Sequence, residues 1–308
     1  MADFLAFGDN ASVPIDFVSS HFYPAPGERD GLAAALSATT NATASHGGRA
    51  ALPVVISEFN SGLRIGCCHD DPYAAAYLVY TLGQVQRHAT RGVASLMYWC
   101  FSDVFEENRP VDANADRPPF HNAFGLQTMQ GIKKPAFRAL ELLASFPNAT
   151  LPSIRTLGNG SVHEASHVDA YAGIQAAPPL HGGGPSSHGT NISVMVSNWV
   201  PTLLPSRSPH VAIEVTVPSA VRGLVSGRGV VCTATITRVP DPKAVWRSMG
   251  APTRLTATQL QQLELATVLA PAQVGCTVVA DGAHGGATAR VLAQMPAQAA
   301  AMISFMLK

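Results

Sequence analysis

The chain has 308 residues, of which 47% are hydrophobic and 13% are charged, and its 20 basic and 20 acidic residues give a formal net charge of zero. This length accommodates one large domain or two ordinary ones. A net charge of zero gives no electrostatic attraction for phosphates, and no window supplies the roughly 20 consecutive apolar residues of a membrane-spanning helix. We therefore expect a globular protein that neither binds nucleic acid nor spans a membrane.

The first part of the chain alternates between predicted strands and predicted helices. Short apolar runs at Ile15–Ser20, Leu52–Ser57 and Ala94–Phe101 predict three strands. Helices are predicted at Pro72–Arg91, where apolar residues recur at helical spacing after a proline, and near Pro135–Ser145. Apolar strands separated by helices predict a parallel sheet whose strands are buried on both faces.

The later part of the chain has the pattern of an antiparallel β-sandwich. Segments rich in glycine and proline, of which Pro178–Gly189 is the clearest, separate its apolar runs. The main runs are Ile192–Val196, Val211–Val217, Val230–Ile236, Val274–Val279 and Met302–Leu307. One helical insertion is predicted at Gln259–Leu269, with Thr256 as its N-cap. We therefore predict two domains, at residues 1–147 and 148–308.

The ends of the three predicted parallel strands carry side chains that suit a sugar site. Functional groups of parallel α/β folds lie just beyond the carboxyl ends of the strands. The residues at these positions are His21 and Tyr23 after the first strand, Glu58 after the second, Trp99 in the third, and Glu106 and Glu107 in the loop that follows. A carboxylate can attack an anomeric carbon, a phenol can orient it, an indole can stack on a sugar ring, and further acids can bind hydroxyls. Each residue alone has an ordinary structural explanation, but their joint placement favours a carbohydrate site.

Several motifs resemble glycoside hydrolase family 39, whose members include β-xylosidases and α-L-iduronidases. They are DFVSSHFYP at Asp16–Pro24, VVISEFNSG at Val54–Gly62, YWCFSDVFEE at Tyr98–Glu107, FHNAFGLQTMQGIKKPAFRALELL at Phe120–Leu143, and VWRSMGAPTRLTATQLQQL at Val245–Leu263. The resemblance spans nearly the whole chain. It implies a retaining glycosidase with a (β/α)8 TIM barrel and an accessory β-sandwich.

The resemblance also implies roles for individual residues. Glu58 matches the nucleophile of the family, and Tyr23 matches the residue that is hydrogen-bonded to the nucleophile. The implied substrate-binding residues are His21, Tyr23, Trp99, Glu106 and Glu107. The peptide bond that follows this tryptophan is often cis in the clan, so we expect a cis bond between Trp99 and Cys100. No cofactor and no metal are implied, because this hydrolysis needs only two carboxyl groups and water.

One feature of the family has no match. Retaining glycosidases need two carboxyl groups about 5–5.5 Å apart, and in this family the acid/base lies in an Asn-Glu pair after the fourth strand. No Asn-Glu dipeptide occurs in the 308 residues, and the match begins just before the sixth strand. We therefore expect the C-terminal part of a family member, with strands six to eight of the barrel followed by the sandwich. Such a chain is expected to be inactive alone, with a glycoside substrate and the missing N-terminal half of the barrel as its partners.

Three functional interpretations remain open at this point. The leading one is a β-xylosidase-like exo-glycosidase. An α-L-iduronidase-like enzyme would need cations for the uronate carboxylate, and none of the candidates near the rim can be assigned: Arg64, Arg109, Arg117, Lys133 and Lys134. A non-catalytic carbohydrate-binding protein agrees with the missing acid but not with the intact sequence around Glu58.

Five Asn-X-Ser/Thr sequons favour a secreted or lysosomal parent protein, although Met1–Phe7 does not have the character of a signal peptide. The sequons begin at Asn10, Asn41, Asn148, Asn159 and Asn191. The five cysteines lack the spacing of a zinc site. Cys232 and Cys276 can form a disulfide in an oxidising compartment or remain as two buried thiols.

Overall fold

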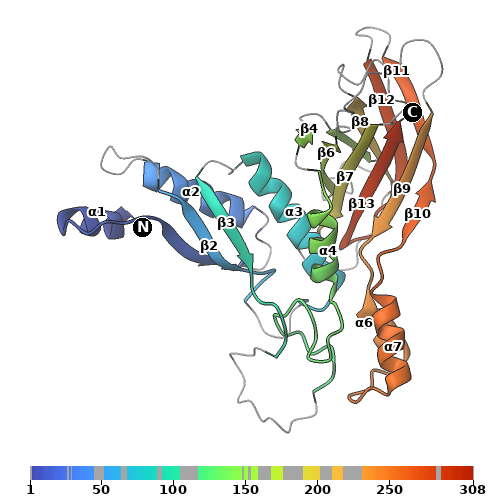
Figure 1. The fold of residues 1–308 in the computed structure, drawn as a ribbon, viewed down its shortest axis with the longest axis horizontal. Helices are drawn as coiled ribbons and strands as arrows, with labels where there is room; N and C mark the ends of the chain where they lie inside the picture. The colour runs from blue at the N-terminus through green and yellow to red at the C-terminus, as the bar shows by residue number, and fades with distance from the viewer. Residues whose placement is uncertain are drawn as a thin grey trace, which may run out of the picture. The chain divides into compact units, whose positions relative to one another are not determined.

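The computed structural model shows two compact units (Figure 1). The first comprises Met1–Ala136 and Asp241–Thr267, and the second comprises Phe137–Pro240 and Val268–Lys308. The residues that the structure describes are 2–25, 28, 30–44, 52–63, 68–88, 92–104, 117–147, 149–151, 154–158, 168–175, 190–201, 210–217, 231–281 and 286–307. Within this described part of the chain, every helix is too short or too polar to span a bilayer.

The first unit contains a parallel sheet with the strand order β1-β2-β3. Its elements are α1 (Ala2–Asn10), β1 (Val18–Phe22), α2 (Gly31–Ala44), β2 (Val54–Phe59), α3 (Pro72–His88) and β3 (Val93–Tyr98). Parallel pairing of the three apolar runs is confirmed. The β1 and β2 strands extend beyond the apolar runs, because the ladder continues through a pairing of His21 with Glu58. His21 and Glu58 therefore lie within their strands rather than after them.

The expected burial of these strands on both faces is wrong. Val54, Ile56 and Phe59 of the central strand β2 are buried, and α2 packs against both β2 and α3. In contrast, Phe17 before β1 and Met97 in β3 are more than half exposed. Side chains of a strand stand on the two faces of the sheet, so these exposed positions are ones that no described helix covers.

Two further helices belong to the first unit although they follow the strand β9 (Cys232–Arg238) in the sequence. They are α6 (Pro242–Ser248) and α7 (Ala257–Ala266). Thr256 is the N-cap of α7 and forms a capping box with Gln259, which confirms the predicted cap. Trp246 of α6 and Leu263 of α7 pack against a core that includes Phe120.

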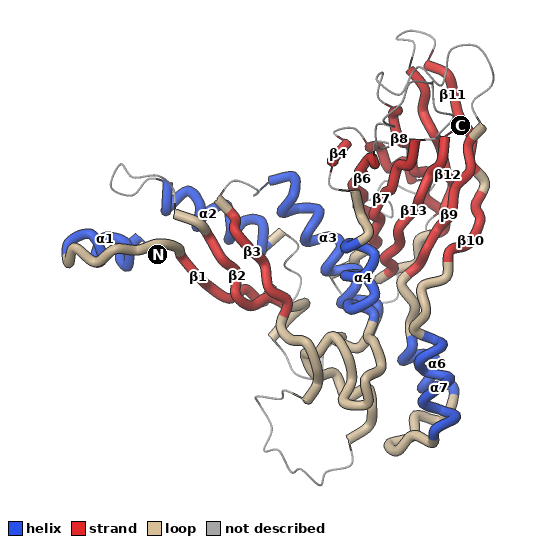
Figure 2. Tube along the Cα trace, viewed as in Figure 1, coloured by secondary structure: helices blue, strands red, loops and turns tan. Residues whose placement is uncertain are grey.

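The second unit consists mainly of two antiparallel sheets (Figure 2). The six-stranded sheet has the order β10-β9-β13-β7-β6-β4 and the four-stranded sheet has the order β11-β12-β8-β5. The strands are β4 (Ala149–Leu151), β5 (Ile154–Gly158), β6 (Val168–Gln175), β7 (Thr190–Asn198), β8 (His210–Val217), β9 (Cys232–Arg238), β10 (Pro271–Val274), β11 (Cys276–Asp281), β12 (Gly286–Gln294) and β13 (Ala299–Leu307). The helix α4 (Pro135–Ala144) precedes them in the sequence.

The two antiparallel sheets share one hydrophobic core. Val194 and Ile303 contribute from the six-stranded sheet, and Ile213 and Val291 contribute from the four-stranded sheet. A disulfide between Cys232 of β9 and Cys276 of β11 connects the two sheets, with 5.6 Å between the Cα atoms. The apolar run expected as one strand at residues 274–279 is divided between β10 and β11, which belong to different sheets.

Candidate active site

The carboxylate of Glu58 is held by two residues of the neighbouring strand and the loop after it. The Tyr23 hydroxyl donates a hydrogen bond of 2.8 Å to Oε2 of Glu58, and Nδ1 of His21 lies 3.0 Å from the same oxygen. Among the described residues, no hydrogen bond or ion pair reaches Oε1. The Glu58 side chain is 18% exposed, so a ligand can reach it. This carboxylate has one stabilised oxygen and one that is available to form a bond.

Trp99 follows β3 directly and its backbone is joined to the strand that carries Glu58. The backbone N–H of Trp99 donates a hydrogen bond of 3.0 Å to the carbonyl of Phe59. The peptide bond between Trp99 and Cys100 is cis, as the family resemblance led us to expect. The backbone of Trp99 therefore lies beside the residue that follows Glu58.

A buried asparagine, Asn60, connects the ends of β2 and β3. Its Nδ2 donates hydrogen bonds to the carbonyls of Trp99 and Phe124, and its Oδ1 accepts from the Ser61 N–H at 2.6 Å and from the Tyr98 hydroxyl at 2.9 Å. Burial raises the pKa of Tyr98 far above its usual value, so its hydroxyl remains a donor. The amide thus fixes two strand ends to one loop.

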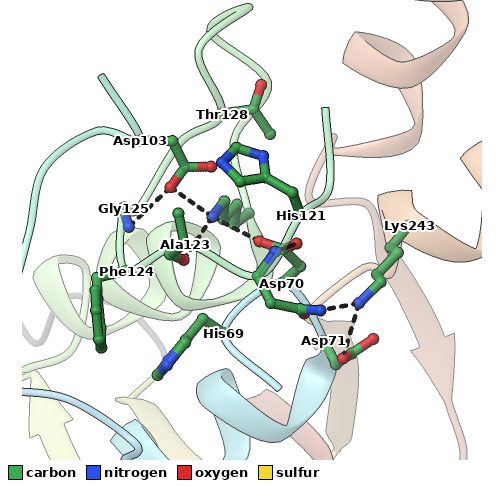
Figure 3. Close-up of polar contacts among 12 residues, drawn as sticks. His69, Asp70, Asp71, Asp103, His121, Ala123, Phe124, Gly125, Thr128 and Lys243 are labelled. Atoms are coloured by element: carbon green, nitrogen blue, oxygen red, sulfur yellow. Dashed lines mark hydrogen bonds and ion pairs between the residues drawn. The ribbon is translucent and has the colours of Figure 1, made fainter. Parts of the chain in front are cut away.

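A buried ionic cluster is formed by Lys134, Asp70 and Asp103, and Figure 3 labels its two aspartates. Nζ of Lys134 lies 2.6 Å from Oδ1 of Asp70 and 2.7 Å from Oδ1 of Asp103, and it donates a hydrogen bond of 2.9 Å to the Ala123 carbonyl. All three charged side chains are fully buried. The cluster joins the segments after β2, after β3 and before α4.

The carboxylate of Asp103 has two further constraints. It accepts a hydrogen bond of 2.9 Å from the backbone N–H of Gly125, where a Cβ atom would collide with the backbone of Asp103. Burial raises the pKa of this carboxyl above its usual value, and the Lys134 ammonium opposes that rise. Only glycine permits this close approach of the two segments.

A second lysine attaches α6 to the same region. Nζ of Lys243 donates hydrogen bonds of 3.0 Å to Oδ2 of Asp71 and 2.9 Å to Oδ1 of Asn122 (Figure 3). Asp71 follows Asp70 in the sequence, and the Asn122 N–H donates a hydrogen bond of 2.5 Å to Oδ2 of Asp70. The adjacent residues Asp70 and Asp71 therefore form ion pairs with two different lysines, Lys134 and Lys243. Among the described residues, no group of three or more His, Cys, Asp or Glu is placed to hold a metal ion.

Comparison with known proteins decides the family. The model of Glycosyl hydrolases family 39 matches residues 1–284. The chain belongs to glycosyl hydrolase family 39. A β-xylosidase of Caldicellulosiruptor saccharolyticus is 27% identical over 284 residues, which are 87% of this chain and 50% of that protein. A β-xylosidase of Geobacillus stearothermophilus is 31% identical over 156 residues, which are 45% of this chain and 29% of that protein.

Solved structures of this family share the fold. A monomeric β-xylosidase from Caulobacter crescentus CB15 superposes with a TM-score of 0.63 at 22% identity, over 99% of this chain and 58% of that chain. A family 39 enzyme from Xanthomonas axonopodis pv. citri gives a TM-score of 0.62 at 21% identity, over 99% of this chain and 57% of that chain. This family 39 chain therefore spans about half the length of the first relatives that it matches.

The structure brings some of the predicted site residues together. His21 and Tyr23 each contact Glu58, and the backbone of Trp99 adjoins that of Phe59. Glu106 and Glu107 lie outside the described residues, so their assignment stays a prediction. Asn60 belongs to the motif VVISEFNSG, for which the resemblance implied a role only for Glu58; its position two residues after Glu58 was a usable signal.

The candidate cations for an iduronate carboxylate differ in burial and in their partners. Lys134 is fully buried and its ammonium is engaged by Asp70 and Asp103, so it is not available to a substrate. Arg117 and Lys133 are partly buried. Arg64 and Arg109 lie outside the described residues.

Proposed function

We propose that this family 39 chain carries the nucleophile of a retaining, β-xylosidase-like exo-glycosidase. The observation that carries the proposal is the asymmetry of Glu58, in which Tyr23 and His21 both contact Oε2 and leave Oε1 open. In this mechanism Oε1 attacks the anomeric carbon as the bond to the leaving oxygen breaks, and water then hydrolyses the glycosyl ester. The names of the curated relatives support xylosides as the substrate class.

We also propose the finer architecture. The sheet β1-β2-β3 corresponds to the sixth to eighth strands of a (β/α)8 barrel, and the two antiparallel sheets form an accessory β-sandwich. Parallel pairing in the first sheet and the common core of the other two support this assignment. In such a barrel the carboxyl ends of β1, β2 and β3 form the rim of the active site.

The remaining roles follow from the same proposal. Trp99 forms the floor beneath the reacting sugar, and Glu106 and Glu107 bind its hydroxyls. Tyr23 and His21 orient the nucleophile, and they stabilise the charge on Oε2 when Oε1 leaves the glycosyl ester. Hydrogen bonds to a charged group contribute about 1.5–3 kcal/mol each.

The acid/base is the second carboxyl that the mechanism requires. The 308 residues contain no Asn-Glu dipeptide to match the family's acid/base. We propose that this group comes from a family segment other than the one matched here, the N-terminal half of the barrel. The chain by itself then reacts only with leaving groups that depart without a proton.

Turnover of an activated xyloside in the presence of azide tests directly whether Glu58 is the nucleophile. The substrate is 2,4-dinitrophenyl β-D-xyloside, whose phenolate needs no protonation, and azide replaces water in the second step without base assistance. We expect release of dinitrophenolate and formation of β-xylosyl azide, identified by NMR, since two displacements retain the configuration. The Glu58→Gln variant is expected to form no β-azide. The matched variant Glu214→Gln, altered in a partly buried glutamate of the second unit, is expected to behave as wild type.

Three outcomes would contradict the proposal or part of it. Formation of α-xylosyl azide by the wild-type chain would show a single displacement without a glycosyl-enzyme. Binding of xylose, detected by ligand line broadening, without any dinitrophenolate release would support the non-catalytic carbohydrate-binding alternative, which the missing Asn-Glu pair favours. Preferential turnover of an aryl α-L-iduronide would replace the xyloside assignment with the iduronidase-like one.

A further inference from the structure

The side chain of Asn60 uses its full hydrogen-bonding capacity. A primary amide has two N–H donors and two acceptor lone pairs. The two donors are directed to the carbonyls of Trp99 and Phe124, and the oxygen accepts from the Ser61 N–H and the Tyr98 hydroxyl, with Ser61 Oγ and His69 Nδ1 each a further 3.2 Å contact of the same oxygen. The orientation of the amide is fixed by these partners, because carbonyls can only accept and the Ser61 N–H can only donate. The side chain is fully buried, so water does not compete for these bonds.

The partners of Asn60 belong to the segments that deliver the proposed site. Trp99 and Tyr98 lie at the end of β3, and Asn60 itself is two residues from Glu58. Phe124 belongs to a loop that pairs with Cys100 through backbone hydrogen bonds of 3.2 Å and 2.8 Å, the second made by Leu126. The ring of Phe124 also makes an edge contact with the ring of Tyr23, with centroids 6.3 Å apart.

We propose that Asn60 is a positioning residue, which fixes Trp99 and the Phe124 loop relative to Glu58. The proposal rests on the proposed function, but its structural part does not depend on activity. Asn60 does not need to contact the sugar. Its side chain is hydrogen-bonded to the carbonyl of Trp99 and to the carbonyl of Phe124, whose ring packs on Tyr23. A single side chain thereby fixes the positions of Trp99 and of the Tyr23 ring near Glu58.

The proposal predicts a specific kinetic effect. A displacement of about 1 Å in a site can reduce the rate by about 100-fold. We expect Asn60→Ala to lower kcat for 2,4-dinitrophenyl β-D-xyloside by about 10- to 100-fold, with a smaller change in KM. Asn60→Asp retains the shape but lacks both donors, and it should resemble Asn60→Ala at neutral pH.

Fluorine NMR tests the structural part without a substrate. The sequence contains three tryptophans, so a chain labelled with 5-fluorotryptophan gives three resonances that single Trp→Phe variants assign. We expect Asn60→Ala to shift or broaden the resonance of Trp99 and to leave that of Trp199 unchanged. The matched control is Asn198→Ala in the second unit, where Nδ2 donates a hydrogen bond of 2.9 Å to the Met295 carbonyl. That control should affect its neighbour Trp199 and not Trp99.

A milder variant covers the case in which Asn60→Ala does not fold. Tyr98→Phe keeps the aromatic ring and removes only the hydroxyl that donates to Asn60 Oδ1. It should move the Trp99 resonance in the same direction and lower kcat by a smaller factor. An unchanged Trp99 resonance in folded Asn60→Ala or Tyr98→Phe would overturn the proposal, and so would an unchanged kcat in an active protein. Absence of turnover in the wild type would contradict the proposed function alone, since the fluorine spectra would still decide the role of Asn60.

Discussion

The two oxygens of Glu58 have different surroundings, and this difference gives a direct prediction for Tyr23. Replacing Tyr23 by phenylalanine removes one of the two contacts to Oε2 and keeps the ring that touches Phe124. A hydrogen bond to a charged group contributes about 1.5–3 kcal/mol. Because Tyr23 stabilises the carboxylate that leaves the glycosyl ester in the second step, Tyr23→Phe should slow steady-state turnover of 2,4-dinitrophenyl β-D-xyloside by about 10- to 100-fold. Stopped-flow absorbance measures this rate, and Tyr171→Phe in the second unit serves as the control. A rate within a factor of two of wild type would argue against the role of Tyr23.

The buried ionic cluster gives a prediction about stability and pH. Removing one partner of a buried ion pair costs about 3–5 kcal/mol, because the remaining charges are left without compensation. Lys134→Met should lower the free energy of unfolding by about this amount at pH 7. Equilibrium unfolding in urea, followed by tryptophan fluorescence, measures the effect. The same substitution at the partly buried Lys133 should have a smaller effect.

The effect of Lys134→Met should diminish in acid. Burial raises the pKa of Asp103 above its value in the unfolded chain, about 3.9. The folded state therefore binds more protons between the two pKa values, and the free energy of unfolding falls as pH rises through the folded pKa. Loss of Lys134 removes the cation that opposes this rise, so the fall becomes larger. A loss of stability that is equal at pH 4 and pH 7 would contradict this account.

At the level of single residues, the sequence allowed part of the site to be predicted. The contact between Tyr23 and Glu58 could be anticipated because both residues lie at the carboxyl ends of neighbouring apolar strands and match one family's motifs. Asn60 and Lys134 could not, because their importance depends on partners from distant segments. Lys134 in particular was one of the candidate cations near the rim, whereas tertiary contacts bury it completely.

Between elements, the disulfide between β9 and β11 should be a main source of stability for the second unit. Its cysteines are 44 residues apart, and a crosslink over a loop of this length restricts the unfolded chain by about 4 kcal/mol in the loop-entropy model. The paired variant Cys232→Ser with Cys276→Ser should unfold at a clearly lower temperature in calorimetry. Cys100→Ala, which removes a buried thiol of the first unit that is not part of a disulfide, is the control. An unchanged unfolding temperature in the paired variant would show that the sheets do not depend on this link.

Elements were predictable where one local pattern was dominant. The strands β2 and β3 and the helix α3 have continuous apolar or periodic sequences, and their positions were anticipated within a few residues. The helix α2 is rich in alanine and threonine, with Leu32 and Leu36 as its largest buried residues, so it lacked a strong apolar period. The division between β10 and β11 was missed because Gly275 interrupts an otherwise continuous run without changing its composition.

For the whole chain, the proposed position of the acid/base gives a prediction about natural linkages. Xylobiose has a poor leaving group that must be protonated, and general acid catalysis contributes about 10²–10⁴-fold. We expect the purified 308-residue chain to show no useful cleavage of xylobiose, while it releases dinitrophenolate from the activated xyloside. Chromatography of the sugars over time measures this. Robust cleavage that Glu58→Gln abolishes would show that another carboxyl group within these residues acts as the acid.

The central claim is that Glu58 is the nucleophile of a family 39 site, and covalent labelling tests it most directly. 2,4-Dinitrophenyl 2-deoxy-2-fluoro-β-D-xyloside forms a glycosyl-enzyme that hydrolyses slowly, so the labelled residue can be identified by mass spectrometry of peptides. We predict one label per chain, at Glu58, with protection by excess xylose. A label at a different carboxylate would contradict the claim, and so would intact protein without any label.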